Sequence, residues 1–315
     1  MNPDKMYQLL CGIFGQEYEV RSGEFRINCF RCDDATGNLE ISLDKGIFHC
    51  WKCNYSGKLV RLLKDYLGYL PNIDEYVSPD DLRRFSPEVL FQKEGRKPGE
   101  FLGLPEEYIS LTSDFLTYVG RKALRYVLSR MTEGDVENYQ IGYCGLGKYK
   151  WRVIIPVIED GRPVYFIART FMGESPTYKN PEKEEVGIGK EEVVFNLGGK
   201  ASREDGVVIC EGVFDAIRVG DAGVAIFGTS LSDIQMFKLL EVSKKFIILL
   251  DGDRPGIEGA IKMAHKLLSL RNEVCVVVPP KGDPSDWSNG EISQWLSQAK
   301  PFNSNQEIRL KLLYI

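Results

Sequence analysis

The sequence predicts a multidomain α/β protein with a small β unit carrying four cysteines, a basic α+β region and a domain built on a parallel β-sheet. Three observations support this fold class. Two Cys-x2-Cys pairs lie near the start, two alternating apolar runs meet at an Asp-Gly pair, and four unbroken apolar runs follow, separated by helical patterns. Unbroken apolar runs are typical of strands buried on both faces of a parallel sheet. With 43% hydrophobic residues in 315, the chain has enough apolar surface for two or three cores.

The first element is the cysteine unit. Cys29 and Cys32 form one pair and Cys50 and Cys53 the other, and the segments EFRIN and GIFHC before them alternate as strands do. Each tight turn places two thiolates on one edge of a tetrahedron, and a hairpin brings the two edges together. We therefore predict a zinc ribbon over residues 1–70 with a structural zinc on all four cysteines. The alternative is four ordinary buried cysteines.

Aromatic and basic side chains lie among these cysteines, including Trp51 and Lys52. Exposed rings can stack on unpaired bases while cations meet phosphates, so the ribbon is a candidate reader of single-stranded template. The alternative is that the rings pack over the metal site. An amphipathic helix is expected from Lys58 to Tyr69, and the proline-rich segment 71–105 is expected to be a linker.

The middle region, residues 106–204, is locally basic although the net charge of the chain is −5. Between Arg121 and Arg169, nine Lys or Arg outnumber five Asp or Glu, and local charge decides binding more than the total. A helix is expected from Phe115 to Met131. A hairpin should follow in WRVIIPVIEDGRPVYFIART, turning at Asp160-Gly161.

Four basic residues of this region are candidates for binding the phosphates of nucleotides and template. Guanidinium and ammonium groups suit such oxyanions. The alternative for each is a solvated surface charge. The candidates are Arg152, Arg169, Lys179 and Lys190.

In the carboxyl half, acidic residues follow three of the four apolar runs. The runs are Val207 to Cys210, Val224 to Phe227, Phe246 to Leu250 and Val274 to Val278. The acids are Glu211 with Asp215, Asp251 with Asp253, and Asp283 with Asp286. Because the carboxyl ends of parallel strands line one edge of a sheet, we expect these carboxylates to converge. Converging charges repel one another unless a divalent cation is bound, and oxygen-only ligands indicate magnesium or manganese. For any single acid, a helix cap is the alternative.

These motifs resemble those of a Toprim domain. EGVFD matches the family's Glu-Gly-x-x-Asp, DGDRPG its Asp-x-Asp, and KGDPSD the Asp-Pro-x-Asp of many primases, with Asp283 as its first acid and Asp286 as its second. Nearly the whole chain resembles DnaG-type primases. FHCWKCNYSGKLVRLL is similar to their zinc-binding domain, with Cys-x2-Cys as in some phage members, and ALRYVLSRMTEGDVENYQIGYC to the entry of their polymerase core. SPTYKNP and IGKEEVVFNLG follow that pattern, with Lys190 in place and Thr177 where lysine is common.

The resemblance implies a DNA primase that makes short RNA primers on single-stranded DNA from ribonucleoside triphosphates by two-metal nucleotidyl transfer. It implies a structural zinc and catalytic magnesium or manganese ions. Metal ions would be held by Glu211, Asp251 and Asp253, with Asp215, Asp283 and Asp286 in support. No P-loop motif occurs, so a separate replicative helicase is the expected partner, in a phage or plasmid setting. The alternatives are a Toprim nuclease and a non-catalytic clamp like a recombination mediator.

The remaining expectations concern location and boundaries. No apolar run is long enough to cross a bilayer and the first residues do not read as a signal peptide, so we expect a cytoplasmic protein without a membrane partner. Residues 205–288 should form the Toprim catalytic domain and residues 289–315 a helical tail.

Overall fold

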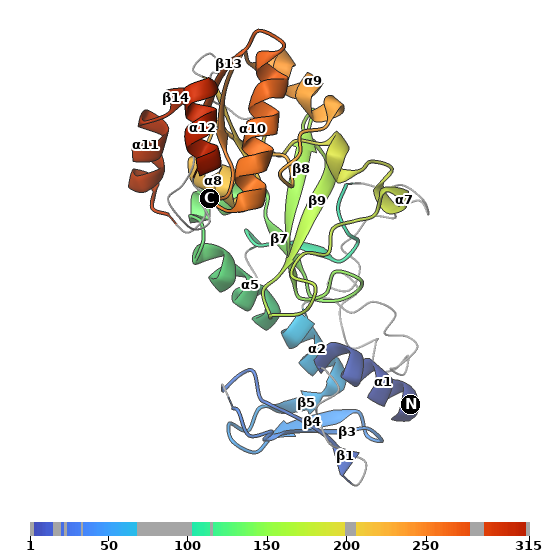
Figure 1. The fold of residues 1–315 in the computed structure, drawn as a ribbon. Helices are drawn as coiled ribbons and strands as arrows, with labels where there is room; N and C mark the ends of the chain where they lie inside the picture. The colour runs from blue at the N-terminus through green and yellow to red at the C-terminus, as the bar shows by residue number, and fades with distance from the viewer. Residues whose placement is uncertain are drawn as a thin grey trace. The chain divides into compact units, whose positions relative to one another are not determined.

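The computed structural model describes residues 3–14, 20–21, 24–32, 34–67, 103–113, 116–198, 206–277 and 287–312 (Figure 1). The chain divides into two compact units. The first comprises residues 1–100 with the segments 113–122 and 145–151, and the second comprises residues 101–112, 123–144 and 152–315. Residues 71–102 of the predicted linker lie outside the described residues.

The cysteine unit is an antiparallel sheet with two helices against it. Its strands follow the order β1-β2-β3-β4-β5. Buried positions alternate with less buried ones along β2 and β3, so one face of the sheet meets the apolar sides of the helices. The predicted helix after the second cysteine pair is confirmed as α2. The elements are α1 (Pro3–Phe14), β1 (Val20–Arg21), β2 (Glu24–Ile27), β3 (Leu39–Ser42), β4 (Ile47–Cys50), β5 (Ser56–Lys58) and α2 (Leu59–Leu67).

The middle region forms a four-stranded antiparallel sheet in the order β6-β7-β8-β9. The predicted hairpin is confirmed, because β8 and β9 are joined by Asp160 and Gly161 alone. Both turn residues have positive φ angles, 49° and 74°, as a tight hairpin turn between twisted strands requires. The elements are β6 (Tyr108–Ser110), α5 (Tyr118–Leu128), α6 (Glu133–Asn138), β7 (Gly142–Cys144), β8 (Arg152–Glu159), β9 (Arg162–Thr170), α7 (Lys183–Val186) and η2 (Lys190–Glu192).

The carboxyl half contains the predicted parallel sheet, in the order β11-β10-β12-β13-β14. The first four strands are parallel, and β14 pairs antiparallel with β13 at the edge. The segment predicted as a helical tail therefore also contributes a strand. The elements are β10 (Val207–Cys210), α8 (Val213–Val219), β11 (Gly223–Ala225), α9 (Asp233–Val242), β12 (Lys245–Leu249), α10 (Arg254–Leu268), β13 (Glu273–Val277), α11 (Asn289–Ser297), β14 (Lys300–Pro301) and α12 (Ser304–Leu312).

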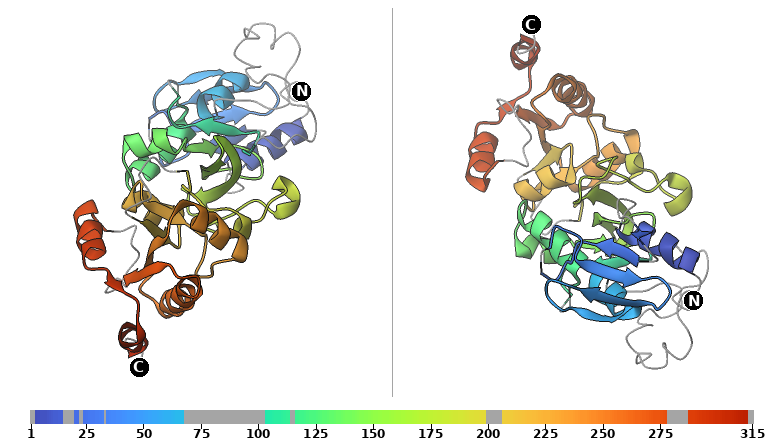
Figure 2. Two further views of the ribbon diagram at one scale, coloured as in Figure 1. Left: turned by 90° about the horizontal axis from the view of Figure 1, so that it is seen from above. Right: turned by 90° about the horizontal axis from the view of Figure 1, so that it is seen from below.

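Helices cover both faces of this parallel sheet (Figures 1 and 2). Helices α9, α10 and α12 share one apolar core with strands β10 to β13. Helix α8 contacts β10 and β11 and also contacts α11. Coverage on both faces explains why the strands read as unbroken apolar runs rather than as alternating ones.

Helix α9 ties the parallel sheet to the segment that follows the hairpin. The side chain of Gln235 is buried and its Nε2 donates to the carbonyl oxygens of Val193 and Ile226, both at 3.0 Å, and of Lys190 at 3.2 Å. One turn later, Lys238 forms a bidentate ion pair with Glu159 at the end of β8, at 2.7 and 2.8 Å. These contacts fix the two sheets of the second unit to each other.

Across the described ranges, no helix is long and apolar enough to traverse a lipid bilayer.

Candidate active site

The four cysteines lie at the tips of two turns in the ribbon sheet. Cys29 follows β2 and Cys50 ends β4, and the chain turns sharply after each. The sulfur atoms of Cys29 and Cys53 are 3.8 Å apart and those of Cys32 and Cys50 are 3.9 Å apart. A tetrahedral zinc with bonds of about 2.3 Å needs sulfur atoms about 3.8 Å apart. The group therefore has the dimensions of a structural zinc site, as predicted.

Trp51 and Lys52 lie in the second of these turns and are exposed. The indole of Trp51 is 66% exposed, and its Nε1 donates to Glu40 at 2.7 Å while its ring meets His49 edge-on, 4.6 Å between centroids. The ring therefore projects from the open face of the sheet rather than covering the cysteines. Of the two alternatives for Trp51, an exposed ring and a ring packed over the metal site, the structure has the exposed ring.

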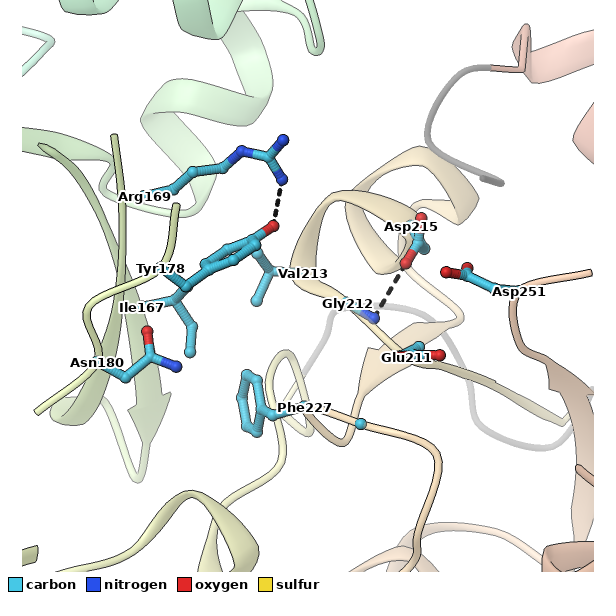
Figure 3. A pocket seen from close by; sticks show the side chains of 11 residues that line it. Ile167, Arg169, Tyr178, Asn180, Glu211, Gly212, Val213, Asp215, Phe227 and Asp251 are labelled. Atoms are coloured by element: carbon cyan, nitrogen blue, oxygen red, sulfur yellow. Dashed lines mark hydrogen bonds between the residues drawn. The ribbon is translucent and has the colours of Figure 1, made fainter. Parts of the chain in front are cut away.

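Three of the predicted acids line one cavity of about 360 Å³ in the second unit (Figure 3). Strands β10 and β12 are parallel neighbours with Cys210 opposite Leu249, so the residues that follow them emerge at the same edge. Glu211 follows β10 and Asp251 follows β12. Asp215 lies in the first turn of α8, where its Oδ2 accepts from the backbone N–H of Gly212 at 3.0 Å.

The other predicted acids are placed differently. Asp253 is the N-cap of α10: its Oδ1 accepts from the N–H of Gly256 at 2.8 Å, and it is not among the residues that line the cavity. Asp283 and Asp286 lie outside the described residues. In the described part of the chain, only the cysteines bring three or more ligand atoms within 4.8 Å of one another. The carboxylates thus form a wider group.

The local field at this edge is negative. Burial raises the pKa of Cys210 well above its ordinary value, and the charges of Asp215 and Asp251 raise it further. Figure 3 shows the carboxylate of Asp251 pointing toward Asp215, whose Oδ2 accepts from the Gly212 N–H, with Glu211 on the same side of the cavity. Carboxylates gathered in this way favour a bound cation.

Arg169, at the end of β9, lies on the opposite wall of the cavity. Its guanidinium donates to the hydroxyl of Tyr178 and lies 4.9 Å from the centroid of that ring and 5.1 Å from that of Phe214. Burial opposes the charged form of Arg169, but the neighbouring Tyr178 and Tyr126 raise its pKa overall. Burial raises the pKa of Tyr178 as well, against the effect of Arg169. The cation therefore stays charged in a partly buried position.

Arg152 does not reach this cavity. Its side chain is 3% exposed, and its two terminal nitrogens donate to the carbonyl oxygens of Thr177 at 3.0 Å and Pro176 at 2.8 Å. In this structure the terminal donors of Arg152 are occupied by backbone acceptors, and its predicted role as a phosphate contact stays a prediction. The residue instead fixes the chain just before Tyr178, which does line the cavity.

The remaining basic candidates are not part of the cavity lining. Lys190 is exposed and lies in η2, and Lys179 is half-buried beside Tyr178. The lining instead contains residues that the sequence did not single out. Besides Tyr178, these are Ile167, Asn180, Val213 and Phe227, with the glycines 212 and 228. A second arginine, Arg130, lies 5.5 Å from the Phe214 centroid, on the same ring as Arg169.

Comparison with known proteins agrees with this arrangement. Residues 208–288 match a family described as Toprim-like. The chain contains a Toprim-like domain and resembles DnaG-type DNA primases. It is 26% identical over 308 residues to the DNA primase of Thermotoga maritima and 26% identical over 318 residues to that of Enterococcus faecalis. Each match covers 81% of this chain, and 53% and 50% of those proteins. The chain thus spans about half the length of the curated relatives it matches.

Solved structures show the same fold. The zinc-binding and RNA polymerase domains of the Aquifex aeolicus primase match 98% of this chain and 88% of that one, with a TM-score of 0.54 and 22% identity. A DnaG catalytic domain bound to single-stranded DNA matches 61% of this chain and 74% of that one, with a TM-score of 0.52 and 19% identity. The Toprim-like domain, the antiparallel sheet before it and the zinc ribbon therefore follow the primase architecture.

Proposed function

We propose that this protein is a DNA primase, which joins ribonucleoside triphosphates into short RNA primers on single-stranded DNA. The observation that carries the proposal is a single cavity lined by Glu211, Asp215 and Asp251 on one wall and by Arg169 on the other. Nucleotidyl transfer needs a negative group to hold metal and a positive group to meet phosphate. The similarity to DNA primases over 81% of the chain supports the same activity.

The carboxylates fit a hard divalent cation. Their donor atoms are all oxygens, and their spacing is wider than that of a compact cage, which suits magnesium because it keeps several water ligands. Glu211, Asp251 and Asp253 would hold magnesium or manganese, with Asp215 in support and Asp283 and Asp286 as further candidates. Such an ion, when bound, lowers the pKa of an attacking hydroxyl and offsets charge on the phosphate.

The side chains around the acids act by position and charge. Asp215 holds the Glu211–Gly212 turn through its bond to the Gly212 N–H, so the Glu211 carboxylate stays at the cavity. Arg169, whose guanidinium lies over the rings of Tyr178 and Phe214, would present its positive charge to the phosphate oxygens of a nucleotide. Lys179, which is half-buried, and Lys190, which is exposed, lie outside the cavity lining and would meet the phosphates of the longer template.

The ribbon would select the template. The exposed ring of Trp51 offers a stacking surface for an unpaired base, and Lys52 beside it offers a cation for the phosphate backbone. We further propose that the protein works with a separate replicative helicase in the cytoplasm during phage or plasmid replication.

The test is primer synthesis by the purified protein on varied single-stranded oligonucleotides with all four ribonucleotides and Mg²⁺ or Mn²⁺. Asp251→Asn should lower primer yield on the order of 100-fold or more while leaving the melting temperature unchanged, because the lost charge acts on the bound ion and phosphate. Asp221→Asn, at an exposed aspartate outside this cavity, is the matched control. Cleavage of the oligonucleotide without primer formation would favour a nuclease instead, and full activity in Asp251→Asn would remove the site assignment.

A further inference from the structure

The cavity that holds the acids has two chemically different ends. Glu211, Asp215 and Asp251 form one end. The opposite wall carries the aromatic rings of Phe227 and Tyr178, on the other side of the backbone of residues 211–213 (Figure 3). Two polar side chains lie on the same wall: Asn180, and Arg169, whose guanidinium donates to the Tyr178 hydroxyl. A nucleotide has the same division, since a planar base and a charged polyphosphate lie at its two ends.

Phe227 reaches the aromatic wall through an unusual backbone conformation. Its φ angle is +63°, a left-handed conformation that a bulky L residue rarely adopts, and Gly228 follows with φ +152°. The backbone of the preceding residue, Ile226, is held on both sides. Its N–H donates to the carbonyl oxygen of Cys210 at 3.2 Å, and its carbonyl oxygen accepts from Nε2 of Gln235 at 3.0 Å. Surroundings that enforce such a conformation at a cavity point to a role for the side chain.

The ring of Phe227 is also supported from the protein side. Tyr165 lies 6.3 Å away between centroids at an angle of 49°, and is itself 2% exposed. The hydroxyl of Tyr165 donates to the carbonyl of Pro181 at 3.2 Å, which fixes the supporting ring. Phe227 is only partly buried and lines the cavity, so ring surface remains on the cavity side.

We propose that Phe227 is the platform on which the base of the bound nucleotide stacks while its phosphates extend toward the acidic end. This assignment rests on the proposed primase function and adds the base subsite to it. A ring face contacts any base without reading its hydrogen-bonding edge, so the subsite accepts all four nucleotides. It binds purines more tightly than pyrimidines, because a purine covers more of the ring.

The experiment compares two probes, ATP and inorganic tripolyphosphate, by equilibrium binding to the full chain in Mg²⁺. Tripolyphosphate carries the phosphates without the base. Phe227→Leu keeps an apolar side chain but removes the ring, and should weaken ATP binding roughly tenfold while leaving tripolyphosphate binding unchanged. It should also abolish the preference for ATP over CTP. Phe237→Leu, at a phenylalanine of α9 that is 62% exposed, is the matched control and should bind both probes as the wild type does.

If Phe227 had a purely structural role, its replacement would change the affinities for ATP and tripolyphosphate by the same factor. Equal weakening of ATP and tripolyphosphate in Phe227→Leu, or unchanged ATP binding, would overturn the assignment. If Phe227→Leu does not fold, Phe227→Tyr keeps the ring and should retain the wild-type ratio of the two affinities, and a lost ratio in a folded Phe227→Tyr would count against stacking. The measurement does not require primer synthesis, so a wild type that binds ATP through its base but makes no primers would contradict the proposed function alone.

Discussion

Replacing Gln235 by leucine should lower the free energy of unfolding of the second unit by about 2–4 kcal/mol. The side chain is 1% exposed and its Nε2 donates to the carbonyl oxygens of Val193 and Ile226 in bonds that are themselves buried. A buried acceptor that loses its donor costs about 1–3 kcal/mol, and two are lost here. The third acceptor, at Lys190, is partly exposed and can turn to water. Leucine has a similar volume, so its own burial offsets part of the cost.

The assay is urea unfolding followed by far-ultraviolet circular dichroism. Gln294→Leu, at an exposed position of α11, makes the same change of side chain and should stay within about 0.5 kcal/mol of the wild type. If Gln235→Leu also stays within that range, the buried amide does not join the two sheets as inferred. A loss that appears with an unchanged dependence on urea concentration would assign the effect to the folded state.

Four further outcomes follow from single sites. Chelation, or Cys50→Ser, should release zinc and unfold the ribbon sheet, as measured by zinc content and by backbone hydrogen exchange of β2 to β4. Gly161→Ala should lower the free energy of unfolding in urea by about 1–2 kcal/mol, because alanine is strained at a φ of +74°. No neighbour lies within 4 Å of the added carbon, so the loss comes from the backbone conformation and not from a clash. Burial, with nearby glutamates, raises the pKa of Tyr165 to about 12. Its contribution to stability is therefore full below pH 10 and is lost as the pH rises toward 12. Tyr165→Phe should reduce the fall of the melting temperature over this range, and the rest of the fall belongs to other tyrosines with a raised pKa, such as Tyr108. Asp253→Asn should leave the stability unchanged, since Asn caps a helix as well as Asp. It should lower primer synthesis, because a negative charge is lost. Full activity in this variant would show that Asp253 acts as a helix cap and not as a metal ligand.

The sheet edge that carries the acids was predictable because two local signals coincide. Strands buried on both faces leave unbroken apolar runs, and Glu211 and Asp251 directly follow two of them. Parallel pairing of β10 with β12 then places both residues at one edge. The hairpin at Asp160-Gly161 was predictable for a similar reason, since the turn depends on two adjacent residues alone.

The basic candidates could not be sorted from the sequence, because their directions depend on strand register. In the hairpin, Arg169 pairs with Val153, the neighbour of Arg152 on β8. Paired residues point to the same face and neighbouring residues on a strand to opposite faces, so the two arginines point to opposite faces of the hairpin. A shift of one residue would exchange their roles. Phe227 was missed for a different reason: its φ of +63° sets the direction of its ring, and no local pattern in an apolar run predicts a left-handed residue.

The two walls of the cavity come from different sheets, and this division makes the joint between them part of the site. The acidic wall belongs to the parallel sheet, whereas Arg169 and Tyr178 belong to the antiparallel sheet and the chain that leaves it. The distance between these two walls is set outside the cavity, by two side chains of α9. Gln235 bonds to the backbone carbonyls of Val193 and Ile226, and Lys238 forms an ion pair with Glu159 of β8. The proposed nucleotidyl transfer requires a cation and a phosphate within a few ångströms of the reacting atoms, so a small movement at α9 would separate the charges that this reaction needs together. Loss of activity without loss of any lining residue is therefore expected for variants that loosen this helix.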